Sequence, residues 1–123
     1  MKVVIVSAHW PIDTHPDHQV ISALTQAVCI QLKTWPLAFF EVLTGIQALD
    51  FAPNRYLDIS PVIDQKNRAI RCHVSQNPES QIKVHERISR FRGQEIGVEH
   101  AEAFHLLNRS VSSTAESFFR YVR

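Results

Sequence analysis

The sequence has few of the residues that would place the protein in a specialised structural class. Its 123 residues include two cysteines, three glycines and one methionine. Two cysteines cannot build the disulfide framework of a small secreted domain, so we expect free thiols and a cytoplasmic location. No segment approaches the roughly eighteen apolar residues of a membrane-spanning helix. The opening residues MKVVIVSAHW are also too short and too soon polar for a signal peptide.

Neither sign of charge dominates the chain. The chain has thirteen Lys and Arg residues and twelve Asp and Glu residues, and its formal net charge is +1. Such a chain gives no electrostatic reason to expect a nucleic acid or a strongly acidic partner. A hydrophobic content of 45% is that of an ordinary globular protein. We therefore expect one domain over residues 1–123 that binds no nucleic acid.

Strand and helix patterns alternate along the chain. An apolar run at 2–8 predicts a strand that is buried on both faces. Further strands are predicted at 38–43 and 54–60, whereas 101–107 fits a strand or a helix. Helices are predicted over 16–33, 60–72, 78–97 and 110–123. The alternation favours an α/β layered, Rossmann-like fold with a mainly parallel sheet.

The first predicted helix has the most regular apolar pattern. Pro16 suits its first position, and Trp35-Pro36 follows its end. Its apolar residues recur at spacings of three and four and predict one apolar face. They are Val20, Ile21, Leu24, Ala27, Val28 and Leu32.

The stretch HWPIDTHPDH, residues 9–18, gathers three of the seven histidines and two carboxylates. It joins a buried strand to a helix, and ligands of α/β sheets bind at the carboxyl ends of strands. The positive end of the helix dipole favours neutral His15 and His18, the form that binds metals. Asp17 can hold one imidazole by a hydrogen bond. The stretch is therefore a candidate metal or catalytic site.

Two simpler interpretations of residues 9–18 explain fewer of their features than a metal or catalytic site does. A helix cap explains Asp13, Thr14 or Asp17 one at a time, but not three histidines at the end of a buried strand. His-Pro-Asp also marks the loop of J-domain co-chaperones, where it lies between two antiparallel helices. A short strand precedes it here, which argues against that family.

HWPIDTHPDH resembles the second motif of the PIG-L/LmbE-like N-deacetylases. These zinc-dependent enzymes remove acetyl groups from N-acetylglucosaminyl conjugates and related amides. The resemblance extends, in order, over about residues 3–107. Its further segments are FFEV at 39–42, PNRYLDIS at 53–60, KNRAIRCHVSQ at 66–76, RG at 92–93 with Gly97, and AEAF at 101–104.

The resemblance implies roles for individual residues. It makes His18 a zinc ligand and His15 the group that stabilises the oxyanion or protonates the leaving amine. It makes Asp17 the carboxylate that orients His15, and it places His73 and Gln76 near the substrate. The implied cofactor is zinc, and the implied substrate is a small N-acetylated amino-sugar conjugate.

The family's first motif, of the type A-H-P-D-D-E, is absent. It supplies a second zinc histidine, a zinc aspartate and the general base, but this chain has no Asp-Asp pair and one His-Pro, at 15–16. Because catalytic zinc usually has three protein ligands, His18 needs others. His9, Asp13 and His15 are the substitute ligands that the chain offers. We therefore expect a deacetylase domain that is incomplete relative to the family.

Three interpretations of this incompleteness stay open. The chain is a half-enzyme completed by a separate amino-terminal half, a non-catalytic remnant that binds a sugar or a partner, or a truncation without a role of its own. Deleting early strands exposes a sheet edge, so pairing with that half or with another copy of the chain is expected.

Overall fold

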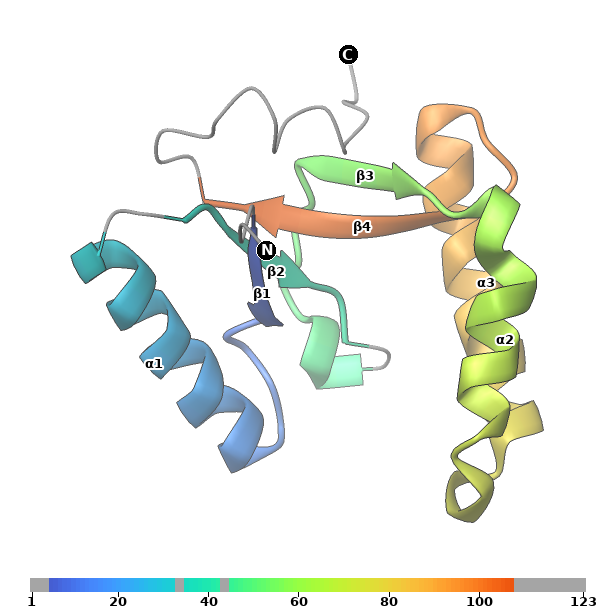
Figure 1. Cartoon of the computed structure of the whole chain (residues 1–123), viewed down its shortest axis with the longest axis horizontal. Helices are drawn as coiled ribbons and strands as arrows, with labels where there is room; N and C mark the ends of the chain where they lie inside the picture. Colours follow the sequence, from blue (N-terminus) through green and yellow to red (C-terminus); the bar gives the residue numbers. More distant parts are fainter. Residues whose placement is uncertain (1–4, 33–34, 43–44, 108–123) are drawn as a thin grey trace.

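The computed structural model describes residues 5–32, 35–42 and 45–107. The helix predicted at 110–123 lies outside these residues. The described chain contains strands β1 (Val6–His9), β2 (Leu37–Phe40), β3 (Arg55–Asp58) and β4 (Ala101–Leu106). It also contains helices α1 (Pro16–Leu32), α2 (Ile63–Arg71) and α3 (Pro78–Ile96), with short 3₁₀ turns at Gly45–Ala48, Ser60–Val62 and Val74–Gln76 (Figure 1).

The four strands form one mixed sheet in the order β1-β2-β4-β3. β1 and β2 are parallel, and α1 connects them, whereas β4 is antiparallel to both of its neighbours. The α/β class is therefore confirmed, but a mainly parallel sheet is not. The physical reason is that an apolar run reports how deeply a strand is buried and carries little information on its direction.

The helices lie on two sides of the sheet. α1 lies beside β1, whereas α2 and α3 pack together at the other side (Figure 1). A small core under α1 contains Ala8, Cys29, Leu37 and Phe39. Among the described residues, no helix has the length and apolar character needed to cross a membrane.

Local sequence signals explain the limits of α3 and the start of β4. Pro78 is at the start of α3, and the helix ends at Gly97, whose φ of 74° is the left-handed conformation that glycine favours. The ambiguous segment AEAFHL is a strand, with Ala101 and Ala103 buried against the α3 side. A Cβ on Gly93 would lie 2.6 Å from the backbone oxygen of Val98. The bare glycine therefore lets α3 approach the link to β4.

The apolar stripe of α1 is not buried by the described residues. Val20, Leu24 and Val28 are 58%, 57% and 49% exposed, whereas the buried residues of α1 are Ser22 and Cys29. Small side chains thus form the packed face, and the stripe predicted from the periodicity faces outward. β1 is an edge strand of the described sheet, so this side of the molecule presents both an apolar helix surface and a strand edge.

Candidate metal centre

The loop between β1 and α1 is organised around the buried carboxylate of Asp13. Its side chain is 0% exposed. Oδ1 accepts the backbone N–H of His15 at 2.8 Å, an interaction two residues along the chain that aspartate commonly makes in turns. Oδ2 lies 2.9 Å from Nδ1 of His18 in the first turn of α1. One carboxylate therefore contacts both histidines of the His-Pro-Asp-His segment.

Hydrogen bonds keep this carboxylate ionised. Burial raises the pKa of Asp13, but hydrogen bonds from the His15 backbone and from the side chains of His18, Gln47 and His15 outweigh it. The net effect holds the pKa of Asp13 well below its usual range, as expected for a carboxylate that accepts several hydrogen bonds.

Three imidazole rings meet at the carboxyl end of β1. His9 stacks on His18 with ring centroids 4.0 Å apart, and the centroids of His15 and His18 are 4.8 Å apart. Burial, and then the neighbouring His18, lower the pKa of His9. Ser22 Oγ donates a 2.8 Å hydrogen bond to the His9 carbonyl, which fastens α1 to the end of the strand. The histidines gathered in the sequence are thus also gathered in space.

Asp13, His15 and His18 form a group that could hold a metal ion. One donor atom from each lies within 4.8 Å of the others. Two donors on one zinc ion are at most about 4.2 Å apart, twice a bond of about 2.1 Å. The donor–donor separation in this group is thus slightly larger than that of a bound zinc site. Its carboxylate and imidazole donors fit a divalent first-row metal ion without selecting zinc. The other proposed substitute ligand, His9, contacts the group by stacking.

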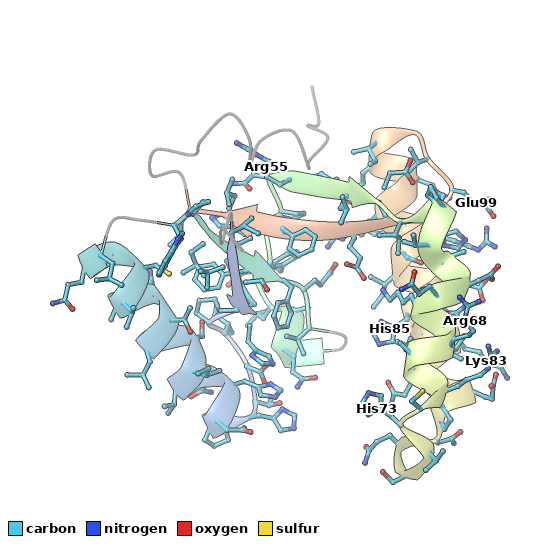
Figure 2. The ribbon with its side chains drawn as sticks, viewed as in Figure 1. Arg55, Arg68, His73, Lys83, His85 and Glu99 are labelled. Carbon is cyan, nitrogen blue, oxygen red and sulfur yellow. The ribbon has the colours of Figure 1, made fainter. Side chains whose placement is uncertain are left out.

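The three histidines open onto a cavity of about 970 Å³. Its opposite wall comes from α2, α3 and the turn between them, where His73 and His85 project toward the cavity (Figure 2). Gln76 lines the cavity as well, and Phe40 and Phe104 are among its apolar residues. The structure therefore brings His15 and His18 into one cavity with His73 and Gln76.

The charges in the cavity wall are balanced. Lys66 Nζ lies 2.7 Å from Glu102 Oε1, and Arg92 makes a bidentate contact with Glu41 at 2.6 and 2.9 Å. All four residues line the cavity. Burial lowers the pKa of Arg92, but Glu41 and also Glu95 raise it above its usual value. Because each charge has an opposite partner, the wall suits an uncharged polar ligand.

The structure assigns the orienting contact to a different carboxylate from the one expected. Asp17 lies in the first turn of α1 with an exposed side chain, and the carboxylate at the two rings is that of Asp13. The position of Asp13, two residues before His15, was the available signal. Gln47 also contacts Asp13 and His15. It lies in the 3₁₀ turn Gly45–Ala48, far along the chain, and no sequence pattern indicates it.

Comparisons with known protein families, with curated proteins and with solved structures find no match for this chain. The function proposed below therefore rests on the residues of the site, their geometry and the motif resemblance.

Proposed function

We propose that this chain forms part of a PIG-L/LmbE-like, divalent-metal-dependent N-deacetylase that acts on small N-acetylated amino-sugar conjugates. One observation carries the proposal. Residues that the motif resemblance assigns to the reaction and to substrate binding come from distant segments, yet they line a single cavity. His15 and His18 are on one wall, and His73 and Gln76 are on the other.

Different residues of the cavity have different roles in the proposed amide hydrolysis. His18 would hold a divalent ion, zinc in the family it resembles, with Asp13 as the neighbouring donor. A bound divalent ion would polarise the acetyl carbonyl and lower the pKa of water. His15 donates a hydrogen bond to the oxygen that gains charge, or a proton to the leaving amine. His73 and Gln76 hydrogen-bond to the sugar from the opposite wall.

We infer that an A-H-P-D-D-E segment from outside these 123 residues completes the site. Asp13 is a poor general base because hydrogen bonds already stabilise its ionised form. A complementing amino-terminal half with an A-H-P-D-D-E motif supplies the base and the remaining ligands. Added parallel to β1, its strand extends the parallel β1–β2 pair toward a Rossmann-like sheet, and its carboxyl end lies at the site.

The exposed surface of α1 and β1 supports a second candidate function, that of a non-catalytic binding or oligomerisation module. The observation in its favour is the exposed stripe of Val20, Leu24 and Val28 beside the edge strand β1. Exposed apolar patches of this kind commonly mark interaction sites. Stable dimers that form without metal would favour this function. For either candidate, the free thiols of Cys29 and Cys72 suit a reducing compartment such as the cytoplasm.

Zinc binding tests the metal site directly. Purified protein is stripped with a chelator and reloaded, and bound zinc is measured by elemental analysis and by competition with a fluorescent chelator. We expect the exchange His18→Ala to weaken zinc binding by about 100-fold or more, since the loss of a supporting partner alone costs 10–100-fold. His73→Ala, in the opposite wall of the same cavity, is the matched control and keeps the zinc.

The outcomes separate the proposals. Equal zinc binding by wild type and His18→Ala contradicts the ligand assignment. If zinc binds, co-expression with a polypeptide carrying the A-H-P-D-D-E motif should release acetate from N-acetylglucosamine conjugates, and His73→Ala should raise KM. Zinc binding without deacetylation in the complemented complex contradicts the deacetylase. Insolubility of the chain in the absence of any complementing polypeptide would favour a truncation.

A further inference from the structure

A charged pair and a histidine lie together in the cavity wall away from the candidate metal centre. Lys66 comes from α2 and Glu102 from β4, and Lys66 Nζ donates a 2.7 Å hydrogen bond to Glu102 Oε1. His85 comes from α3, and all three side chains line the cavity. Three separate elements therefore bring polar groups to one part of the wall, and the motif resemblance assigns a role to none of them.

The paired charges keep hydrogen-bonding capacity for a ligand. A lysine ammonium has three hydrogens and a carboxylate has two acceptor oxygens, and the contact between Lys66 and Glu102 uses one of each. The side chain of Lys66 is 22% exposed and that of Glu102 is 38% exposed, so a ligand in the cavity can reach both. The pair thus offers donors and an acceptor side by side with little net charge.

His85 adds an uncharged donor and acceptor to this pair. Burial, and then the charge of Lys66, lower the pKa of His85, and the smaller opposing effect comes from Glu102. The ring is therefore neutral at neutral pH and has one N–H and one lone pair. Among the described residues, neither nitrogen of this ring takes part in a hydrogen bond or an ion pair. Because partly buried polar groups usually have partners, the ring is well placed to bond a ligand.

Apolar side chains flank the three polar ones. Val84 and Ile88 lie on the same side of α3 as His85, and Ile70 of α2 lines the cavity beside them. A sugar ring has hydroxyl groups at its edge, each of which both donates and accepts, and C–H groups on its two faces. A wall that combines donors and acceptors with apolar side chains therefore fits a sugar better than it fits an ion or a purely apolar ligand.

We propose that Lys66, His85 and Glu102 form a hydroxyl-binding subsite that takes two neighbouring hydroxyl groups of a neutral sugar. Glu102 accepts the hydrogen of one hydroxyl, and Lys66 donates to the other. His85 donates or accepts according to the orientation of the pair. In the proposed deacetylase, on which this placement rests, the subsite holds the sugar of the conjugate. Binding itself needs neither a metal ion nor the complementing segment, so it is tested separately from the reaction.

Binding of N-acetylglucosamine to the metal-free protein tests the subsite. The titration is followed by the backbone amide signals of α2, α3 and β4 in ¹H–¹⁵N NMR. We expect a dissociation constant of about 1 mM for so small a ligand. In this sugar the neighbouring hydroxyls are those on ring carbons three and four. An analogue that lacks either one should bind about tenfold more weakly, because it leaves a polar group of the subsite unpaired.

Variants of the three residues test their individual parts. Lys66→Met and Glu102→Gln should each weaken binding of N-acetylglucosamine by about tenfold, and His85→Phe, which keeps a ring without nitrogens, by about threefold. The matched controls are Lys83→Met on α3 and Glu99→Gln just before β4. They make the same chemical changes at side chains that do not line the cavity (Figure 2), and should bind as tightly as the wild type.

Several results would overturn the proposal. They are no binding by the wild type at about 50 mM sugar, analogues that bind as tightly as N-acetylglucosamine, or tighter binding of a phosphorylated sugar, which would make Lys66 an anion site. If a variant fails to fold, the analogue series with the wild type still decides. Failure of the subsite leaves the zinc test of His18 intact. Conversely, sugar binding by a chain that binds no zinc would contradict the metal-dependent reaction alone.

Discussion

Helices α1 and α3 have similar lengths but are packed in different ways. α3 buries Ile82, Ser89, Arg92 and Gly93 among its 19 residues, whereas α1 buries Ser22 and Cys29 among 17. The helix with the more regular apolar stripe is thus the one whose stripe stays exposed. Apolar periodicity shows that a helix has a face to cover, but it does not show that the same described chain covers it. The candidate metal centre lies at the poorly covered helix.

The two regions should therefore respond unequally to substitution. The α3 side holds paired charges and a close backbone approach, and we expect it to carry most of the stability. The α1 side holds the site and an open surface, and we expect its exposed positions to affect assembly more than folding.

The largest effect is expected at Arg92. Its side chain is 11% exposed and pairs with Glu41 and Glu95. Arg92→Met leaves two partly buried carboxylates without their cation, so the free energy of unfolding should fall by about 4 kcal/mol in urea denaturation. The control is Arg90→Met on the same helix, where the ion pair with Glu86 is exposed and the loss should stay below about 1 kcal/mol. Equal losses would contradict the contrast between buried and surface pairs.

A smaller but still large effect is expected at Gly93. A Cβ there meets the backbone oxygens of Val98 and Glu99 at 2.6 and 2.8 Å. Gly93→Ala must push α3 away from the link to β4, and we expect a loss of about 2–3 kcal/mol. At Gly97 a Cβ has open space, and the positive φ alone should cost about 1 kcal/mol in Gly97→Ala. A Gly93 variant as stable as wild type would show that this approach is not needed.

On α1, Ser22 should have an intermediate effect. It is 0% exposed, and its hydroxyl bonds to the His9 carbonyl at the end of β1. Ser22→Ala should lower the free energy of unfolding by about 1 kcal/mol. Thr25→Ala removes a comparable hydroxyl bond, within the helix and exposed, and should change little. If both variants lose the same amount, the Ser22 bond does not specifically fasten α1 to the strand.

The smallest effect on folding is expected on the stripe itself. Leu24→Lys places a charge at a position that is already 57% exposed, so the free energy of unfolding should change by less than about 0.5 kcal/mol. Binding to a complementing chain, or self-association, should instead weaken by about tenfold or more in analytical ultracentrifugation. A large loss of stability in the isolated chain would show that the stripe is already covered.

Local chemistry made much of the secondary structure predictable. Pro16 and Pro78 stand at the starts of α1 and α3, and Gly97 ends α3, because these residues suit those backbone positions. Strand direction was not predictable in this way. The pairing of β4 with β2 and β3 depends on how α3 returns the chain to the sheet, and that is a property of tertiary packing.

The candidate site divides in the same way. The spacing of His15 and His18 and the end of a strand were visible in the sequence. The expected burial of that strand on both faces is wrong, because β1 is an edge strand of the described sheet and, of Val6–His9, Ala8 alone is buried. The contact of Asp13 with both rings depends on the path of the chain between β1 and α1. The contact of Gln47 depends on a 3₁₀ turn, and Gln47 lies 32 residues beyond His15. Such contacts depend on specific geometry, and some join residues far apart in the sequence, so the residue pattern alone does not reveal them.

The size of the cavity has a thermodynamic consequence. A cavity of about 970 Å³ has room for many water molecules. A ligand that fills it must return much of this water to bulk from a wall that includes Phe40, Val84, Ile88 and Phe104. Removing apolar surface from water lowers the heat capacity. Titration calorimetry at several temperatures should therefore give a binding enthalpy that becomes steadily more negative on warming, whichever ligand fills the cavity.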